Sequence, residues 1–419
     1  MKTKGLRLYG ENDLRLEEFD LPEITDDELL VKIVADSLCM SSYKAATQGV
    51  AHKRVPDNVA EKPVIIGHEF CGKILQVGEK LTDKYKVGQK FTLQPAQLDT
   101  YDAAGYSYEY LGGNMQVGII PKNYIDQNAV LLFEGEGYYQ GSLTEPLSCV
   151  IGATHANYHT RLGVYTHDMG IKDRGNMAIL GGCGPMGLAL IDYIIHRDKL
   201  KPRLLVVTDI KQANIDAAEK SLSKEMAAKQ GVELVYLNGD SPSYTDEMMA
   251  LTGGKGYDDV FVFVPVASLV EEADSLLGHD GCLNFFAGPS DKNFSAKFNF
   301  YNVHYNATHI VGTTGGNTAD MQEALDMSAA GRLNPSLLLS HIGGLDAAAD
   351  ATLNLPHLPG FKKLIYNDIS MPLTAIEDFA EKGKTDPLFE ALAEICDRHN
   401  GLWSVEAEQY LLANAPQIN

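Results

Sequence analysis

A glycine-rich stretch, GGCGPMG at residues 181–187, constrains the fold more than any other part of this 419-residue sequence. It follows an apolar run at residues 177–180 and precedes an apolar helical pattern, PMGLALIDYIIHRD. Gly182, Gly184 and Gly187 give the spacing G-x-G-x-x-G, which is a weak signal alone and a specific one between a strand and a helix. The stretch therefore predicts a strand–turn–helix unit whose backbone can approach a phosphate group at the helix N-terminus.

Strands and helices alternate from about residue 175 onward. The runs NMAILGG, RLLVVTDI, ELVYLN, DDVFVFVP, CLNFFAG and HIVGTTGG are typical of strands, and AAEKSLSKEMAAKQG is typical of one long charged helix. Such alternation predicts a parallel, doubly wound sheet, that is, an α/β Rossmann-type unit running to about residue 311. We expect NAD(P)(H) to bind there, at Gly182, Gly184, Pro185, Met186, Gly187, Asp209 and Lys211.

Asp209, at the end of the strand after the glycine-rich loop, bears on which dinucleotide binds. A carboxylate there would accept hydrogen bonds from the adenosine ribose and would repel the 2′-phosphate of NADP(H), which favours NAD(H). Lys211, two residues on, would attract that phosphate, so NADP(H) remains an alternative. A glycine turn that binds no nucleotide is the competing interpretation.

The first 150 residues have a different rhythm. Short apolar runs broken by turns, ELLVKIVADSLC, PVIIGHEFCGKILQVG, GQKFTLQP and VGIIPKNYI, predict strands of a mostly antiparallel body. The length of the chain favours two domains. After residue 311 we expect a helix at QEALDMSAAG, a strand at KKLIYN and a mainly helical C-terminal segment.

Charge and cysteine spacing exclude several classes of protein. A formal net charge of −21 and a pI near 4.9 repel nucleic acid and anionic membranes. The six cysteines are scattered without a CxxC pair, which argues against a disulfide framework and a four-cysteine zinc lobe. Because the sequence has no bilayer-spanning apolar run and no signal-peptide core, we expect a cytoplasmic protein without nucleic-acid or membrane partners.

Separated positions carry side chains that can bind a metal ion. Cys39 ends a predicted strand, His68 and Glu69 lie in GHEFCG, and Glu145 lies in TEPLSC. A thiolate, an imidazole and a carboxylate can form a zinc site that leaves one position open for water or substrate. The residue types alone do not decide the matter, because a buried histidine is more often hydrogen-bonded in a core than bound to metal.

These motifs, in this order and spacing, resemble the zinc-dependent medium-chain alcohol dehydrogenases, and EPLS is most similar to their sorbitol/polyol dehydrogenase branch. The resemblance covers about residues 1–366. It implies a GroES-like, mostly-β catalytic domain formed by residues 1–150 and 312–419, with a C-terminal helical extension, and a Rossmann cofactor domain at residues 151–311. The length, the insertion AHKRVPDNVAEKP and the extension are most similar to the L-sorbose 1-phosphate reductase type within that branch.

The resemblance also implies one catalytic zinc per subunit. Cys39 and His68 would be ligands, and Glu69 and Glu145 would share the third position, one binding while the other exchanges with water. Ser41 would receive the proton of the substrate hydroxyl, with Glu69 beside it as part of the catalytic group. Lys44 replaces the histidine that commonly ends the family's proton relay, and Ser42 replaces an aspartate that supports the zinc-bound histidine.

The implied activity is hydride transfer between NAD(P)(H) and a polyol or ketose. A sugar phosphate is the expected substrate, as in the interconversion of L-sorbose 1-phosphate and glucitol 6-phosphate. Relatives assemble as dimers or tetramers, so we expect a homodimer or homotetramer. The alternatives are a zinc-free quinone or enone reductase of the same superfamily and a non-enzymatic nucleotide-binding protein.

The insertion carries a cationic group, His52-Lys53-Arg54, that could bind a phosphorylated substrate, since arginine grips phosphate in bidentate fashion. An ordinary exposed loop explains it equally well. Lys44 could likewise relay a proton, contact an anionic substrate or be a solvated loop lysine.

Other residues of interest have structural rather than functional interpretations. We expect Tyr101, Tyr106, Tyr108 and Tyr110 to cover a strand edge rather than line a pocket, Cys71 and Cys183 to pack, and His155 and His159 to share the helix joining the domains without a metal.

Overall fold

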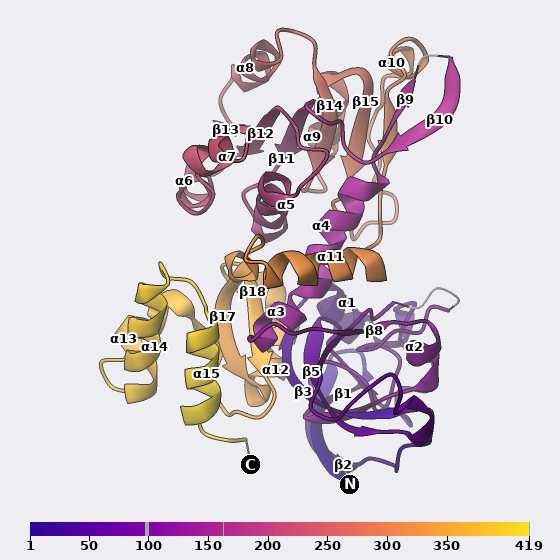
Figure 1. The fold of residues 1–419 in the computed structure, drawn as a ribbon, viewed down its shortest axis with the longest axis vertical. Helices are drawn as coiled ribbons and strands as arrows, with labels where there is room; N and C mark the ends of the chain where they lie inside the picture. The colour runs from indigo at the N-terminus through magenta and orange to yellow at the C-terminus, as the bar shows by residue number, and fades with distance from the viewer. Residues whose placement is uncertain (97–99, 162, 419) are drawn as a thin grey trace. The chain divides into compact units, whose positions relative to one another are not determined.

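The chain forms two compact units in this computed structural model, which describes residues 1–96, 100–161 and 163–418 (Figure 1). The first, here called the β-rich unit, comprises residues 1–145, 321–329 and 338–419. The second, the α/β unit, comprises residues 146–320 and 330–337. The sequence analysis places the divisions at 150/151 and 311/312, and the structure places them at 145/146 and 320/321.

The β-rich unit contains an eight-stranded sheet in the order β19-β17-β18-β3-β5-β6-β8, with β7 paired to β3. Its strands are β3 (Leu29–Ser37), β5 (Phe70–Val77), β6 (Lys90–Leu93), β7 (Val117–Ile120), β8 (Val130–Leu132), β17 (Leu339–Gly344), β18 (Lys362–Tyr366) and β19 (Thr374–Ala375). The β17–β18 pair is parallel and the other pairs are antiparallel. Leu29, Val31 and Ile33 alternate along β3 and are fully buried, as expected of a strand with one face on the core.

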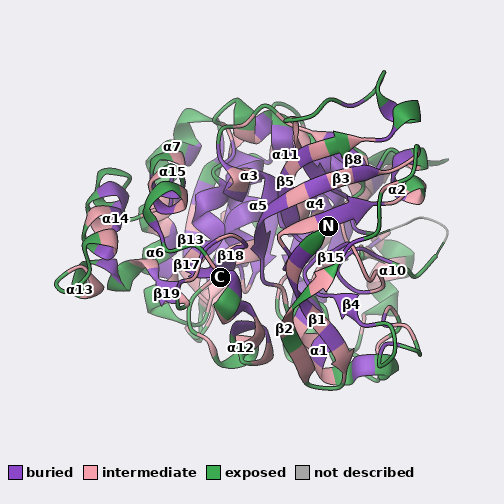
Figure 2. Ribbon diagram, turned by 90° about the horizontal axis from the view of Figure 1, so that it is seen from below, coloured by how far each residue is buried: buried purple, intermediate pink, exposed green. Residues whose placement is uncertain are grey.

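A smaller sheet and several helices complete this unit. The sheet has the order β2-β1-β4 and consists of β1 (Lys2–Gly10), β2 (Asp13–Asp20) and β4 (Val64–Ile65). The helices are α1 (Met40–Gln48), α2 (Lys122–Asp126), α3 (Tyr138–Ser142), α12 (Ala348–Leu353), α13 (Phe379–Lys382), α14 (Pro387–Arg398) and α15 (Val405–Asn414). Two further helices cross the divisions between the units, α4 (Thr144–Ala156) and α11 (Thr318–Ala329). Figure 2 shows β3 with mostly buried residues.

The α/β unit is built on a six-stranded parallel sheet in the order β13-β12-β11-β14-β15-β16. The strands are β11 (Asn176–Leu180), β12 (Leu204–Asp209), β13 (Glu233–Asn238), β14 (Tyr257–Val262), β15 (Leu277–Phe285) and β16 (His309–Val311). Helices α5 (Pro185–His196), α6 (Gln212–Ser221), α7 (Lys224–Lys229), α8 (Tyr244–Leu251), α9 (Ala267–Leu276) and α10 (Phe300–Tyr305) accompany them, with a hairpin of β9 (Tyr158–Arg161) and β10 (Val164–Met169). This strand order is that of a doubly wound dinucleotide-binding fold.

Three predicted elements differ in detail. The expected long charged helix is interrupted, because the Ser223 hydroxyl accepts a hydrogen bond from the Met226 backbone N–H and starts α7 as a new helix. The expected strand VGIIPKNYI ends at Ile120, since Pro121 cannot donate a backbone hydrogen bond and directly precedes α2. The expected strand around GHEFCG is divided into β4 and β5 at Gly67, whose φ is +102°. In the described parts of the chain, no helix is both long and apolar enough to cross a bilayer.

Candidate active site

The glycine-rich loop joins β11 to α5 in the α/β unit. Pro185 is the first residue of α5, and Gly184 precedes it in an extended conformation. A Cβ on Gly187 would lie 2.0 Å from the carbonyl oxygen of Gly182, so the helix can pack on the turn only with glycine there. A Cβ on Gly184 would meet none of the described atoms within 4 Å, which leaves room above the helix N-terminus. Both features fit the pyrophosphate of a dinucleotide.

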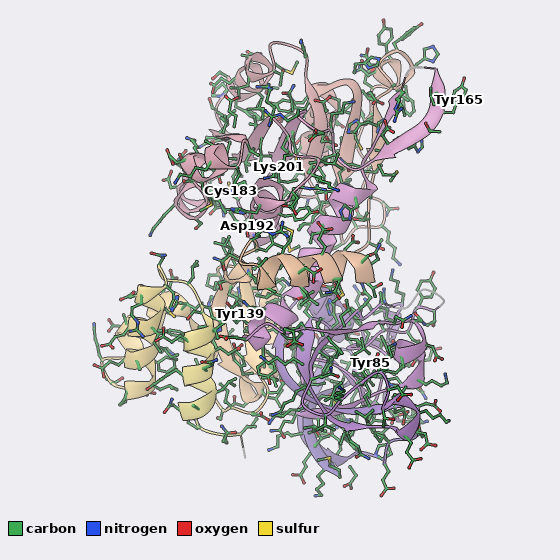
Figure 3. The ribbon with its side chains drawn as sticks, in the orientation of Figure 1. Tyr85, Tyr139, Tyr165, Cys183, Asp192 and Lys201 are labelled. Atoms are coloured by element: carbon green, nitrogen blue, oxygen red, sulfur yellow. The ribbon has the colours of Figure 1, made fainter. Side chains whose placement is uncertain are left out.

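Asp209 ends β12, the strand next to the loop. Its Oδ1 accepts hydrogen bonds from the backbone N–H of Lys211 at 3.0 Å and the side chain of Asn214 at 3.3 Å, which fix the carboxylate. The Lys211 side chain is exposed. Cys183, labelled in Figure 3, is buried inside the loop, and burial raises the pKa of its thiol to about 12. A neutral, buried thiol is a packing residue, as its sequence position indicates.

Cys39, His68 and Glu69 come together in the β-rich unit. Cys39 lies between β3 and α1, and the other two residues immediately precede β5. One ligand atom from each lies within 4.8 Å of the others. Gly67 makes this turn possible, because a Cβ there would lie 2.4 Å from the side chains of both Asp36 and Asn114. A donor set of a half-buried sulfur with a buried nitrogen and a buried oxygen fits zinc.

His68 is held by two hydroxyl groups. Its Nδ1 lies 3.1 Å from Ser42 Oγ and 2.9 Å from the Tyr106 hydroxyl, which is also 3.3 Å from Nε2. Burial lowers the pKa of His68 to about 4, so the ring is neutral, the form that binds a metal ion. Ser42 therefore occupies the supporting position expected from the sequence. The contact from Tyr106 contradicts its predicted place at a strand edge, since this buried side chain belongs to the site.

Glu69 forms a buried ion pair that the sequence did not reveal. The Lys362 ammonium lies 2.6 Å from both of its carboxylate oxygens, and the Ser37 hydroxyl donates a further hydrogen bond to it. Burial is the largest single effect and would raise the pKa of Glu69. The charges of Lys362 and His68, with the hydrogen bonds from Lys362 and Ser37, together outweigh burial and lower that pKa. Glu69 is therefore held as a carboxylate whose oxygens are already engaged.

Glu145 lies in the first turn of α4 and is half-buried. It is outside the group of ligand atoms formed by Cys39, His68 and Glu69, yet its charge acts on Cys39 and Lys362. Burial first, and then the charge of Glu69, raise the pKa of the Cys39 thiol to about 12, with a smaller contribution from Glu145. A thiolate in this acidic surrounding needs a cation beside it, which a metal ion would supply.

Asp36 and Asn114 lie behind the cluster. Asp36 is fully buried in β3 and accepts hydrogen bonds from the Glu69 backbone N–H at 3.1 Å and from the Asn114 side chain at 2.9 Å. Burial, followed by the charge of Glu69, raises the pKa of Asp36 well above its usual value. The signal for this residue was present in the sequence, because an aspartate inside an apolar strand is seldom there without a polar role.

The insertion packs on the Tyr106 ring, whose hydroxyl contacts His68. The His52 ring stacks on the Tyr106 ring with a centroid distance of 5.7 Å, and the Arg54 guanidinium lies 5.6 Å from the centre of the same ring. Lys53 lies 5.8 Å from the centre of the Tyr101 ring. Burial lowers the pKa of His52, and the positive charges of Arg54, Lys53 and Lys44 lower it further. Arg54 and His52 therefore lie against Tyr106, and Lys53 lies against Tyr101.

Ser41 and Lys44 both lie on α1, so Lys44 is not a loop residue. Ser41 is exposed and hydrogen-bonds with Tyr106, which lowers the pKa of the phenol, although burial is the larger effect and raises that pKa well above its usual value. Lys44 is half-buried. Helix α1 thus presents Ser41, Ser42 and Lys44 in the turns that follow the Cys39 thiol.

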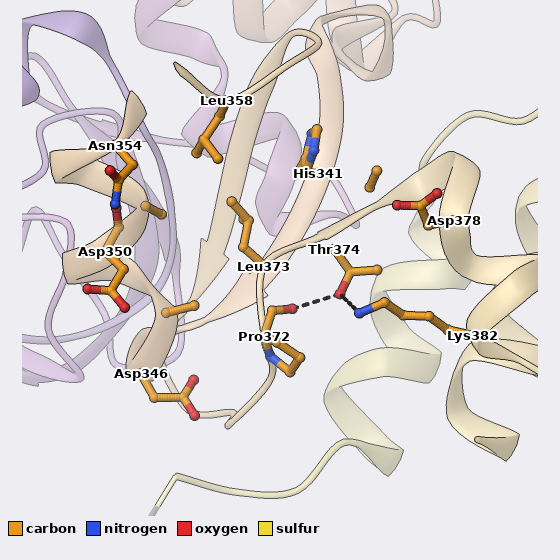
Figure 4. Close-up of a pocket in the computed structure, with 13 residues that line it drawn as sticks. His341, Asp346, Asp350, Asn354, Leu358, Pro372, Leu373, Thr374, Asp378 and Lys382 are labelled. Carbon is orange, nitrogen blue, oxygen red and sulfur yellow. Dashed lines mark hydrogen bonds between the residues drawn. The ribbon is translucent and has the colours of Figure 1, made fainter. Parts of the chain in front are cut away.

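A separate pocket of about 640 Å³ lies beside β17 and β19 in the β-rich unit (Figure 4). Asp346, Asp350 and Asp378 line it together with one cationic residue, Lys382. Its described lining includes none of the residues predicted for the site. An acidic lining of this kind would repel a phosphate ester, so the pocket is not a second candidate for the substrate site.

The residues set aside in the sequence analysis have structural partners. Helix α4 ends at Ala156, so His155 and His159 do not share a helix; His159 is in β9 and lies beside Asp259 and Asp280. Within the described parts of the chain, no second group of three histidine, cysteine or acidic side chains lies so close together. The Cys71 thiol is buried in β5 and donates a hydrogen bond to the Tyr138 carbonyl oxygen.

The fold and the site define a zinc-type dehydrogenase, and the comparisons with known proteins agree. The Zinc-binding dehydrogenase family model matches residues 205–330, and the Alcohol dehydrogenase GroES-like domain model matches residues 25–144. The chain belongs to this family of oxidoreductases. The predicted family and the GroES-like plus Rossmann fold are thereby confirmed.

The chain is similar over nearly its whole length to two sugar-phosphate enzymes. It is 51% identical over 416 residues to mannitol-1-phosphate 5-dehydrogenase of Aliivibrio fischeri, and the match covers 98% of this chain and 97% of that protein. It is 50% identical over 418 residues to L-sorbose 1-phosphate reductase of Klebsiella pneumoniae, covering 99% and 98%. Among solved structures, 2R,3R-butanediol dehydrogenase from Bacillus subtilis has the same fold, with a TM-score of 0.69 and 18% identity over 87% of this chain and 100% of that one.

Proposed function

We propose that this chain is a zinc-dependent sugar-phosphate dehydrogenase, which transfers a hydride reversibly between NAD(H) and a polyol phosphate or ketose phosphate. The observation that carries the proposal is the packing of His52 and Arg54 on Tyr106, whose hydroxyl contacts His68. Tyr106 thus contacts both the insertion that carries Lys53 and Arg54 and a residue of the metal-ligand cluster. The names of the two relatives, which each contain a sugar 1-phosphate, support the same substrate class.

Cys39 and His68 would hold the zinc ion, together with a carboxylate. Because Lys362 and Ser37 already engage Glu69, we propose that Glu145 exchanges with water at the third position while Glu69 balances the charge of the site. When bound, zinc supplies Lewis-acid polarisation of a hydroxyl or carbonyl group. The chain's own residues then fix the histidine ring, through Ser42 and Tyr106, and keep the surrounding charge balanced.

Ser41 is the proposed acceptor of the substrate's hydroxyl proton. It lies on α1, two residues after Cys39, and its link to Tyr106 places a second hydroxyl beside it. Lys44, one helical turn further on, either passes the proton to solvent or contributes to phosphate binding. The charges of Lys44, Lys53 and Arg54 all act on His52, which supports the second role.

We propose NAD(H) as the preferred dinucleotide. The Asp209 carboxylate is held by two hydrogen bonds at the end of β12, where it can accept from both ribose hydroxyls and would repel a 2′-phosphate. Lys211 keeps NADP(H) as the alternative. The glycine-rich loop would bind the pyrophosphate through backbone N–H groups at the start of α5.

A substrate panel tests this proposal. Purified protein is assayed with polyol phosphates, ketose phosphates and their unphosphorylated counterparts, each with NAD(H) and NADP(H). We expect turnover of the phosphorylated compounds with NAD(H), and loss of turnover after dialysis against a chelator with recovery on adding zinc. Full activity of a metal-free preparation would instead support a zinc-free reductase, and the absence of turnover across the panel would support a nucleotide-binding protein without enzyme activity.

We also propose a homodimer formed through the edge of the α/β sheet. β16 is an edge strand, and the hairpin β9–β10 is joined to it by a stack of Tyr158 on His309 with a centroid distance of 4.0 Å. Exposed apolar side chains surround this edge, namely Val164, Tyr165, Met169, Phe300, Tyr301, Tyr305 and Ile310. Apolar groups of this size gathered beside an unpaired strand are typical of an interface between proteins, and a second copy can pair antiparallel with the same strand.

A further inference from the structure

Glu408 is a buried carboxylate in the C-terminal segment, which lies beyond the residues matched by either family model. It is on α15, and only 1% of its surface is exposed. Among the described residues, no lysine, arginine or histidine forms an ion pair with it. The motifs that carry the resemblance lie within about residues 1–366, and they gave this segment no role.

Glu408 joins three separate elements. Its carboxylate accepts hydrogen bonds from the backbone N–H groups of Tyr138 at 2.6 Å and Tyr139 at 2.8 Å, which are the first residues of α3. Tyr139 is labelled in Figure 3. It also accepts one at 2.7 Å from the hydroxyl of Tyr366, the last residue of β18. Trp403, the only tryptophan of the chain, donates to the same Tyr366 hydroxyl at 2.9 Å. Helix α15 is thereby tied to both α3 and β18.

Both α3 and β18 carry a residue that hydrogen-bonds to Glu69. Ser142, the last residue of α3, donates a hydrogen bond from its hydroxyl to the Glu69 carbonyl oxygen at 2.6 Å. Lys362, the first residue of β18, holds the Glu69 carboxylate. Helix α3 also packs tightly on β5, since a Cβ on Gly141 would lie 2.9 Å from the Cβ of Cys71. A displacement of α3 or β18 would therefore be transmitted to the backbone or the side chain of Glu69.

Burial makes the ionised form of Glu408 costly. Burial raises the pKa of its carboxyl to about 7, although the three hydrogen bonds oppose this rise. Burying a carboxylate without a cationic partner costs folding free energy, and an apolar side chain of similar size is often at least as stabilising. What the carboxylate provides is the ability to accept from three donors on two elements at once.

We propose that Glu408 is a positioning residue for the metal-ligand cluster, holding α3 and β18 so that Ser142 and Lys362 keep Glu69 in place beside Cys39 and His68. Glu145, in the first turn of α4, follows Ser142 by three positions. This inference rests on the proposed function, because it assigns the C-terminal segment a role in the zinc site of that dehydrogenase.

Zinc affinity of the full chain tests the inference. In Glu408→Gln, an amide of the same size replaces one accepting oxygen with an NH2 group, which cannot accept from a backbone N–H. We expect zinc to bind about 10-fold or more weakly in a chelator competition, because groups that orient metal ligands have effects of that order. The visible spectrum of the cobalt-substituted protein should shift as well. Glu406→Gln is the matched control, since Glu406 is exposed on the same helix and pairs with Arg398, and its zinc affinity should equal that of the wild type.

Several outcomes decide the matter. Wild-type affinity and spectrum in Glu408→Gln would overturn the inference while leaving the proposed function intact. If Glu408→Gln does not fold, Tyr366→Phe replaces it, because that variant loses one of the three donors and keeps both backbone contacts; weaker zinc binding supports the inference and unchanged binding overturns it. A wild-type protein that binds no zinc would overturn the proposed function and this inference together, whereas zinc binding without sugar-phosphate turnover would overturn the function alone.

Discussion

At the scale of single residues, a substitution in the buried pair of Lys362 and Glu69 tests most directly which contacts hold the site together. Replacing Lys362 with methionine leaves a carboxylate buried without a partner, and breaking such a pair costs about 3–5 kcal/mol. We expect the free energy of unfolding, measured in urea, to fall by that amount. Lys80→Met is the control: its partner Asp27 is partly exposed, and an exposed ion pair contributes about 0–1 kcal/mol. Equal losses in both variants would contradict the importance of the buried pair.

The cationic insertion gives a second prediction at this scale. Replacing Lys53 and Arg54 with alanine should raise the KM for a sugar phosphate by about 10-fold or more and leave the KM for the unphosphorylated polyol unchanged, since each charge-assisted hydrogen bond contributes about 1.5–3 kcal/mol. Steady-state kinetics on both substrates measure the split. Lys62→Ala, which removes an exposed lysine from the same insertion, should leave both values unchanged. Equal effects on the two substrates would mean that the insertion does not contact phosphate.

What the sequence could predict at this scale depends on the residue type. Cys39 and His68 stood out because each has few roles other than metal binding or packing, and the structure brings them together with Glu69. Lys362 could not be singled out, because a lysine in KKLIYN has the same letters whether it is solvated or paired with a residue 293 positions away. Tyr106 was assigned to a strand edge because its contact with His68 depends on the fold of a loop, which the sequence pattern does not reveal.

At the scale of elements, the buried Glu408 of helix α15 leads us to expect an unusual dependence of the free energy of unfolding on pH. The pKa of Glu408 is about 7 in the folded chain and has its ordinary value near 4.5 when exposed, so the folded state binds this proton more tightly. The contribution of Glu408 to the free energy of unfolding is therefore fully present below pH 4.5 and is lost as the pH rises towards 7. By linkage, the loss amounts to about 3 kcal/mol at most.

Comparison with Glu408→Gln isolates this effect. Other groups near the carboxylate are Lys90, Cys71, Tyr138 and Tyr366, and the substitution leaves all of them in place. We expect the free energy of unfolding of the wild type, relative to that of the variant, to decrease between pH 5 and pH 8. A constant difference over this range would mean that Glu408 titrates normally and that its burial carries no cost.

The elements themselves were predictable to the extent that they follow from local pattern. The parallel sheet around the glycine-rich loop was predictable, because strands that are buried on both faces are continuous apolar runs in the sequence. The single charged helix was not resolved into α6 and α7, because the serine that starts α7 also fits a helix interior. The C-terminal helices could be predicted as helices, but the role of α15 depends on hydrogen bonds to residues 269 and 270 positions earlier.

At the scale of the whole molecule, the exposed edge of the α/β sheet predicts how chains associate. β16 offers unpaired backbone groups, and the neighbouring hairpin carries Tyr165, which is fully exposed, as Figure 3 shows at the end of β10. Leaving this edge in water would expose both hydrogen-bonding groups and apolar surface, and pairing two copies would cover both. Because one strand edge can pair only once in this way, the contact closes as a dimer with two-fold symmetry.

Replacing Ile310 with lysine on β16 should therefore give a monomer, because a charge on each copy would meet its equivalent across the two-fold axis. Light scattering coupled to size-exclusion chromatography measures the mass of the wild type and the variant. Val87→Lys is the control: Val87 is an apolar residue of the β-rich unit that is 66% exposed, against 49% for Ile310, and its replacement should not change the mass. A wild type that is monomeric, or a variant that remains dimeric, would contradict the proposed interface. Dinucleotide binding should persist in the monomeric variant, because the glycine-rich loop lies at β11 and β12 in the interior of the sheet and not at its β16 edge.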